Sequence, residues 1–270
     1  MSAHANTGTV LDRILDARRA AVDHRKRVLP ETALKYGVKA ASPLRDFAGA
    51  LSRDALNVIA ELKPASPSRG VIRDPFDPGD LAQSLAAAGA AALSVLTEPE
   101  FFGGSLKNLR DARKEIGAPV LRKDFIFDSW QVWESRANDA DSFLLIVAAL
   151  DDALLRELLS LGRELGMEPL VEVHTVAELA RALAAGARII GVNNRDLRTL
   201  DVRIETSFEL IELIPDDRIA VAESGLSTNT DLRRLRAAGF DAFLIGEHLM
   251  RADDPAAALT ELLGAEPAAG

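Results

Sequence analysis

The sequence contains no cysteine, and this absence excludes disulfide bonds, thiolate metal ligands and a cysteine nucleophile. A chain without disulfides is compatible with the reducing cytoplasm. Long hydrophobic runs are also missing, because no stretch approaches the roughly 18 consecutive apolar residues of a membrane-spanning helix. The polar start, residues 1–8, lacks the apolar segment of a signal peptide. We therefore expect a cytoplasmic protein without a membrane partner.

Positive charge is scarce relative to negative charge. The chain has 32 Lys and Arg against 41 Asp and Glu, for a formal net charge of -9. A field of this sign disfavours broad attraction to nucleic acid, so an anionic ligand needs a local cationic pocket. The four histidines show no metal-ligand spacing, and we expect neither a metal nor a nucleic-acid partner.

The 270 residues are 48% hydrophobic and 27% charged, a balance typical of one globular domain with a large core. From Asn57 onward, short apolar runs alternate with Ala- and Leu-rich helical patterns, which predicts parallel strands joined by helices. The predicted strands are residues 58–62, 92–96, 120–123, 143–147, 170–173, 189–192, 219–222 and 242–245.

Several predicted helices begin at a capping residue and end at a glycine. These pairs are Asp80 with Gly89, Ser105 with Gly117, Asp151 or Asp152 with Gly166, Thr175 with Gly186, and Thr230 or Asp231 with Gly239. Eight βα units are what a (β/α)8 TIM barrel requires, whereas a doubly wound sheet usually has roughly five to seven strands and often a glycine-rich dinucleotide turn that we do not find. We therefore predict an α/β fold of the closed-barrel type.

The residues before the first strand form two helical patterns, 10–28 and 44–51, separated by Pro30 and Pro43. We predict that residues 1–56 are an N-terminal helical extension packed on the barrel and that residues 57–264 form the (β/α)8 barrel. Residues 265–270, rich in Ala, Pro and Gly, are expected to be a disordered tail of this single domain.

Polar residues follow most of the predicted strands, where catalytic groups of these barrels lie. They are Glu61, Lys63, Ser66, Lys123, Asp124, Glu172, His174, Asn193, Asn194, Arg195, Glu223, Ser224, Gly246 and Glu247. Two lysines and two glutamates of this set, Lys63, Lys123, Glu61 and Glu172, suit proton transfer, because pairing and partial burial can set one group as acid and another as base.

Each of these charged residues also has a purely structural interpretation. Glu61 and Lys63 lie two apart on a strand, point the same way, and can form an ion pair that stabilises the barrel. Lys123 can belong to a solvated turn. An unpaired buried carboxylate is costly, so we expect Glu172 to pair with Lys63 or Lys123.

A second group of small residues, Ser224, Gly225 and Gly246, follows the last two strands. The loops in this place form the recurrent phosphate site of these barrels, although an ordinary turn is the alternative. The carboxylate of Glu247 repels phosphate unless it turns away. Arg195 can grip a carboxylate with two hydrogen bonds or pair with Asp196.

Six ordered motifs resemble the indole-3-glycerol phosphate synthase family over about residues 11–250. The motifs are Ile-Ala-Glu-Leu-Lys followed by Ala-Ser-Pro-Ser, Leu-Thr-Glu-Pro-Glu-Phe-Phe-Gly-Gly-Ser, Arg-Lys-Asp-Phe-Ile, Pro-Leu-Val-Glu-Val-His, Gly-Val-Asn-Asn-Arg-Asp-Leu and Ala-Glu-Ser-Gly-Leu. The resemblance implies a carbon-carbon lyase of tryptophan biosynthesis that uses no cofactor or metal. Its substrate would be 1-(2-carboxyphenylamino)-1-deoxyribulose 5-phosphate, cyclised with loss of carbon dioxide and water.

The resemblance also implies roles for individual residues. Lys123 is expected to be the general acid of ring closure, Glu172 and Lys63 to transfer protons towards dehydration, and Glu61 to orient Lys63. The remaining contacts implied are Asn193 to the reacting hydroxyls, Ser66 and Arg195 to the anthranilate carboxylate side, Phe102 and Phe125 around its ring, and Lys63, Ser224, Gly225, Gly246 and the Glu247 backbone to phosphate.

Three places depart from the family pattern, and one of them is the segment 137–141, which has no glycine where relatives usually have a glycine turn. Pro64 stands where a second basic residue often follows the strand lysine, and Glu247 stands where some relatives carry Ser. The rival interpretations are a sugar isomerase such as phosphoribosylanthranilate isomerase, whose usual cysteine base this chain lacks, and a non-catalytic barrel. We expect a monomer or weak homo-oligomer.

Overall fold

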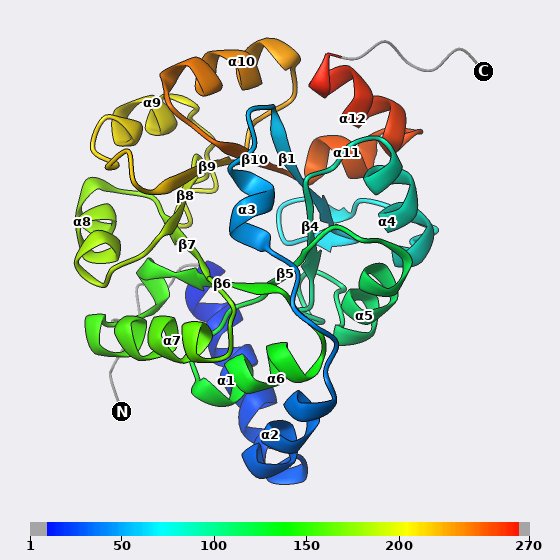
Figure 1. Cartoon of the computed structure of the whole chain (residues 1–270), viewed down its shortest axis with the longest axis vertical. Coiled ribbons are helices and arrows are strands. Elements are labelled where there is room, and N and C mark those ends of the chain that lie inside the picture. Colours follow the sequence, from blue (N-terminus) through cyan, green and yellow to red (C-terminus); the bar gives the residue numbers. More distant parts are fainter. Residues whose placement is uncertain (1–9, 265–270) are drawn as a thin grey trace.

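Eight parallel strands close into a barrel in the computed structural model, which describes residues 10–264 (Figure 1). The strand order around the barrel is β1, β10, β9, β8, β7, β6, β5 and β4, with β4 closing on β1. Helices alternate with the strands, as the sequence predicts for a (β/α)8 TIM barrel. The predicted tail, residues 265–270, and the polar start, residues 1–8, lie outside the described residues.

The barrel strands are β1 (Asn57–Leu62), β4 (Ala92–Leu96), β5 (Val120–Lys123), β6 (Ser142–Ile146), β7 (Leu170–Val173), β8 (Ile189–Asn193), β9 (Ile219–Glu223) and β10 (Ala242–Ile245). Each strand lies within one residue of its predicted position. A short antiparallel pair, β2 (Ala65–Ser66) and β3 (Gly70–Val71), shapes the loop after β1, where only a turn was expected.

The helices are α1 (Val10–Val28), α2 (Glu31–Ala40), α3 (Phe47–Leu51), α4 (Pro78–Ala87), α5 (Leu106–Glu115), α6 (Ser129–Ala137), η1 (Val147–Ala149), α7 (Asp152–Glu164), α8 (Val176–Ala184), α9 (Glu205–Ile211), α10 (Asn229–Ala238), α11 (Glu247–Arg251) and α12 (Pro255–Leu263). The prediction missed α2, which fits between Pro30 and Pro43. It also began α3 too early, because Asp46 caps the helix by accepting a 2.8 Å hydrogen bond from the Gly49 N–H.

Most predicted helix ends are confirmed. Ser105, Asp151 and Thr175 cap their helices, and the chain takes the left-handed conformation at Gly89, Gly166, Gly186 and Gly239. Three predictions were wrong. Asp77 caps α4 in place of Asp80, because Pro78 occupies the first helical position, and Thr228 caps α10 in place of Thr230 or Asp231. The helix α5 is followed by the extended residue Ile116, and Gly117 does not take the left-handed conformation.

The side chains alternate between the barrel interior and the helices, with a period of two residues. Ile59, Leu121, Leu170 and Val221 belong to the cluster that fills the interior, whereas their neighbours pack against the helices. The same alternation carries the charged residues two positions further on, Glu61, Lys123, Glu172 and Glu223, to the inside of the barrel mouth.

The N-terminal helices α1 and α3 contact the interior of the barrel, and α2 packs against α6 on the outside. Figure 1 shows α3 across the near end, where Phe47 and Leu51 join the interior cluster. Leu11 and Leu15 of α1 belong to the same cluster. None of the helices in residues 10–264 is long and apolar enough to cross a membrane.

Candidate active site

The barrel mouth opens into a cavity of about 720 Å³. Twelve of the thirteen predicted site residues line it: Glu61, Lys63, Phe102, Lys123, Phe125, Glu172, Asn193, Arg195, Ser224, Gly225, Gly246 and Glu247. The thirteenth, Ser66, lines an adjoining cavity of about 120 Å³ together with Lys63, Phe102 and Phe125. The structure therefore brings the predicted residues together at one end of the barrel.

Lys123 lies between two carboxylates at the centre of this cavity. Its Nζ is 3.0 Å from Oε2 of Glu172 and 2.8 Å from Oε2 of Glu223. Burial disfavours the charged amine, but the attraction of Glu172 and Glu223 outweighs it and raises the pKa of Lys123 above its usual range. Lys123 is therefore a permanent cation at neutral pH, and Glu172 pairs with it instead of with Lys63.

The two carboxylates that share Lys123 differ in their protonation. Burial opposes ionisation of Glu172, but Lys123 and His174 outweigh it and hold the pKa of Glu172 well below its usual range. For Glu223, burial and the neighbouring Glu172 charge outweigh Lys123 and raise the pKa to about 7. Two neighbouring carboxyl groups with such different pKa values are the pattern expected of a catalytic acid and base pair.

Glu223 is the main residue to which the sequence interpretation assigned no role. It was one of the polar strand-end residues, and its position two after Val221 places it inside the barrel. Gly191 on the neighbouring strand makes room for it, because a Cβ on Gly191 would overlap Oε1 of Glu223. The parity of the strand was the signal that could have identified it.

Glu61 and Lys63 form an ion pair, with Oε1 and Nζ 2.7 Å apart. Glu61 is buried, and its carboxylate lies directly over Gly246. A Cβ at Gly246 would overlap that carboxylate. The position after β10 must therefore be glycine for Glu61 of the neighbouring strand β1 to keep its place.

Asn193 and Ser224 are joined across the ends of β8 and β9. The Ser224 hydroxyl donates a 2.8 Å hydrogen bond to Oδ1 of Asn193, which also accepts the Arg195 N–H at 3.0 Å. Ser224 and Gly225 both have left-handed backbone angles, with φ of 67° and 78°. Such a conformation is uncommon for a serine and is concentrated at functional sites.

The side chain of Glu247 faces the cavity and is surrounded by arginines. Its carboxylate is 3.0 Å from Arg69, 3.5 Å from Arg195 and 3.7 Å from Arg251. Arg195 also donates to the Leu200 carbonyl at 3.1 Å. The alternative partner for Arg195 is wrong, because Asp196 pairs with Arg198 instead.

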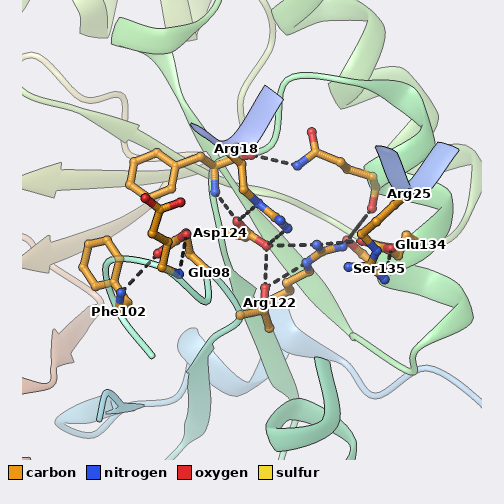
Figure 2. Close-up of polar contacts among 12 residues, drawn as sticks. Arg18, Arg25, Glu98, Phe102, Arg122, Asp124, Glu134 and Ser135 are labelled. Carbon is orange, nitrogen blue, oxygen red and sulfur yellow. Dashed lines mark hydrogen bonds and ion pairs between the residues drawn. The ribbon is translucent and has the colours of Figure 1, made fainter. Parts of the chain in front are cut away.

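Phe102 and Phe125 face each other on one wall of the cavity, with ring centroids 6.0 Å apart and planes tilted by 39°. A buried carboxylate fixes the backbone of each. Glu98 accepts the Phe102 N–H at 3.1 Å (Figure 2). Asp124 accepts the Phe125 N–H at 2.8 Å. The backbone positions of both phenylalanines therefore depend on buried carboxylates at or next to the cavity.

Asp124 directly follows Lys123 and is the centre of a buried polar network (Figure 2). Its carboxylate accepts hydrogen bonds from the Thr97 hydroxyl at 2.6 Å, from Arg122 at 2.9 Å and from Arg18 of α1 at 2.8 and 2.6 Å. Within residues 10–264, no group of three or more His, Cys, Asp or Glu side chains is arranged to hold a metal ion.

Comparison with known proteins gives one consistent family. Residues 11–262 match the family model described as "Indole-3-glycerol phosphate synthase". Proteins of that name from Burkholderia vietnamiensis and Variovorax paradoxus are 47% and 48% identical over 257 and 261 residues. Both alignments cover 94% of this chain and 98% of the relative.

Solved structures with the same fold are more distant in sequence. 3-Hexulose-6-phosphate synthase from Salmonella typhimurium gives a TM-score of 0.62 at 13% identity, over 77% of this chain and 97% of that one. Thiamine phosphate pyrophosphorylase from Pyrococcus furiosus gives 0.56 at 20% identity, over 78% and 95%. At these identities the similarity concerns the barrel fold alone.

Proposed function

The chain belongs to the indole-3-glycerol phosphate synthase family, and from this premise we propose that it converts 1-(2-carboxyphenylamino)-1-deoxyribulose 5-phosphate to indole-3-glycerol phosphate. The reaction closes a ring and releases carbon dioxide and water, which makes the protein a carbon-carbon lyase of tryptophan biosynthesis. The observation that carries the proposal is the position of Lys123 between Glu172 and Glu223 at the barrel mouth.

Lys123 serves as the general acid of ring closure. The carbon that carries the carboxylate attacks the ketone carbon, and Lys123 gives a proton to the ketone oxygen as negative charge develops there. Departure of carbon dioxide then returns its bonding electrons to the ring. The raised pKa of Lys123 supports this assignment, because the amine is fully protonated before the substrate binds.

Glu172 and Lys63 carry the proton transfers that lead to dehydration. Glu172 is ionised at neutral pH and can accept a proton. Lys63 is held by Glu61 at 2.7 Å, which orients its amine towards the same cavity. Asn193, fixed by the Ser224 hydroxyl, is positioned to hydrogen-bond the reacting hydroxyl groups.

Phe102 and Phe125 contact the aryl ring of the substrate. If the aryl ring of the substrate stacks between Phe102 and Phe125 at about 3.5 Å from each, the two phenylalanine centroids must lie about 7 Å apart. The observed separation of these centroids is 6.0 Å. A sandwiched ring therefore requires the two side chains to separate by about 1 Å. Ser66 and Arg195 lie on the same side of the cavity and bind the aryl carboxylate, for which Arg195 exchanges Glu247 for the substrate.

The phosphate binds at the ends of β9 and β10. Ser224, Gly225 and Gly246 allow backbone N–H groups to approach an anion, and Lys63 adds a positive charge. Glu247 contributes only its backbone N–H. Its carboxylate remains paired with Arg69, which limits its repulsion of the phosphate.

We infer that the protein acts in the cytoplasm as a monomer or weak homo-oligomer, without cofactor, metal or nucleic acid. A phosphorylated metabolite cannot cross membranes freely, so its enzyme must share its compartment. Light scattering of the purified chain between 1 and 100 µM is expected to give a mass near 29.0 kDa at the dilute end. A stable higher mass there would contradict the oligomeric inference.

The proposed activity is tested by mixing the purified chain with the carboxyphenylamino-deoxyribulose phosphate. We expect indole fluorescence to appear together with one carbon dioxide per product, without added metal or cofactor. Chelator-treated protein is the control for adventitious metal. Absence of both signals would refute the proposed function.

A further inference from the structure

His174 is the first residue after β7, and its imidazole spans two carboxylates. Nδ1 lies 3.0 Å from Oε2 of Glu178, and Nε2 lies 3.3 Å from Oε1 of Glu172. The side chain is only 9% exposed. The Nδ1 contact is a hydrogen bond, whereas Nε2 is buried without one and lies only at ion-pair distance from Glu172. A carboxylate beside each ring nitrogen favours the doubly protonated imidazole, which is a cation.

The first turn of α8 holds this arrangement. The Thr175 hydroxyl accepts the Glu178 N–H at 3.2 Å, as in the predicted capping box. The reciprocal bond departs from that motif, because Glu178 accepts the His174 backbone N–H at 2.8 Å in addition to contacting its ring. The helix start therefore fixes both the backbone and the ring of His174.

The charged groups near this ring include one cation, because Lys123 of β5 is bonded to the other oxygen of Glu172 and opposes a positive charge on His174. The end of β8 contributes the neutral Asn193 and Asn194, and η1 contributes Val147, Ala148 and Ala149. Arg181 of α8 is bonded to Asp152 and to the carbonyls of Val147 and Leu150. The ionisable groups that contact the imidazole in residues 10–264 are thus two carboxylates, and burial is outweighed so that the pKa of His174 rises to about 10.

Glu172 and Glu223 consequently have different electrostatic surroundings. Glu172 has His174 at one oxygen and Lys123 at the other. Glu223 shares only Lys123, and its Oε1 is buried without a hydrogen-bond partner among residues 10–264. A buried carboxyl oxygen without a partner favours the protonated acid over the anion.

We propose that His174 is a positioning residue, a charged imidazolium that keeps Glu172 ionised and directed at Lys123 and so leaves the exchangeable proton on Glu223. This inference deepens the proposed function, on which it rests. When Lys123 gives its proton to the ketone oxygen, Glu223 returns one to the amine, while Glu172 remains free to accept a proton from the substrate.

The charge of His174 is tested without substrate by 15N NMR of the labelled full chain from pH 5 to 10.5. Single His→Gln variants assign the four imidazoles. We expect both His174 nitrogens to be protonated at pH 8 and to titrate near pH 10. A neutral His174 ring at pH 8 would overturn the proposal, whatever the protein catalyses.

Its effect on the reaction is tested with His174→Gln, which keeps an amide donor but loses the charge, and with His174→Leu, which loses both. We expect kcat to fall about tenfold and more than about tenfold, respectively, with KM within about twofold. The acid limb of the pH profile of kcat should move to higher pH, because the pKa of Glu172 rises when the neighbouring positive charge is lost. His24→Gln is the matched control and should leave both parameters and the profile unchanged.

A purely structural role for His174 predicts a different outcome. Loss of thermal stability with an unchanged pH profile of kcat in the folded His174→Gln variant would contradict the proposal. If the wild-type chain forms no indole product, the proposed function fails, whereas the NMR titration still decides the state of His174. The two failures are therefore distinguishable.

Discussion

Arg18, on the helix that precedes the barrel, donates hydrogen bonds of 2.8 and 2.6 Å to the carboxylate of Asp124, the residue after Lys123 (Figure 2). Both side chains are buried. Burial opposes the charge on Asp124, but Arg122 and Arg18 outweigh it and lower the pKa of Asp124. The N-terminal extension is thereby bonded to the strand end that presents the central lysine.

Arg18→Met should destabilise the protein strongly, because it leaves a buried carboxylate with fewer compensating charges. Losing one partner of a buried ion pair costs about 3–5 kcal/mol, and the remaining Arg122 places the expected loss near 3 kcal/mol. Urea denaturation measures this loss. We expect a single transition, since the extension and the barrel are proposed to form one domain.

Lys26→Met is the matched control for Arg18, on the same helix. Lys26 pairs with Asp128 at 2.6 Å, but its side chain is 39% exposed, and such pairs contribute about 0–1 kcal/mol. Equal destabilisation by the two substitutions would contradict the role given to burial. A separate early transition in Arg18→Met would indicate that the extension unfolds independently.

Glu223→Gln should lower kcat about 10- to 100-fold. It should also remove the change in kcat near pH 7 from the plot of kcat against pH, because that change follows the titration of Glu223. The same substitution has a defined effect on stability. Because the folded-state pKa of Glu223 is raised from 4.5 to about 7, its contribution is fully present below pH 4.5 and is lost as the pH rises through 7. The variant should therefore gain stability relative to wild type between pH 4.5 and 8, measured by denaturant unfolding at each pH.

The reverse trend for Glu223→Gln, with the wild-type chain gaining relative stability as the pH rises, would show that Glu223 is an ordinary ionised carboxylate. An unchanged kcat profile would remove it from the proton relay.

Glu172→Gln should reduce kcat far more than it raises KM, because the carboxylate acts on the reacting atoms more than on substrate affinity. Steady-state kinetics at pH 7.5 separate the two effects. A change confined to KM would reassign Glu172 to binding.

Gly246→Ala should impair turnover by displacing Glu61 from Lys63, because the new Cβ would occupy the space of the Glu61 carboxylate. The backbone at Gly246 has φ of -122°, which alanine tolerates, so the effect comes from the clash and not from backbone strain. We expect kcat to fall about tenfold or more.

Gly117→Ala provides the control for Gly246→Ala. No atom lies within 4 Å of a Cβ at Gly117, and its backbone is not left-handed. We expect wild-type kinetics and a stability change within about 0.5 kcal/mol. Wild-type turnover in Gly246→Ala would show that catalysis does not depend on the observed position of the Glu61 carboxylate.

The barrel strands were predictable because strands covered on both faces are continuous apolar runs, and a charge at their ends marks the mouth. The helix α2 was missed because only Leu34 of its ten residues is buried, so its apolar pattern is weak. Its boundaries follow from Pro30 and Pro43, which the prediction took only as separators.

Partner choice within the site was not predictable from sequence. The carboxylate of Glu172 had two possible lysine partners, and the distance to Lys123 decides between them. Glu223 and Arg18 meet their partners 100 and 106 residues away along the chain. Such pairings depend on barrel closure and on the docking of α1, which no local pattern encodes.

Lys123→Ala tests the central claim most directly, in a single-turnover experiment with enzyme in excess over the carboxyphenylamino-deoxyribulose phosphate. Circular dichroism and denaturation at pH 5.5 confirm folding, since protonation of Glu172 or Glu223 then relieves their repulsion. We predict that the rate at which indole fluorescence appears falls at least about 1,000-fold, while the variant still binds substrate. Indole-glycerol phosphate formation at the wild-type rate would contradict the account.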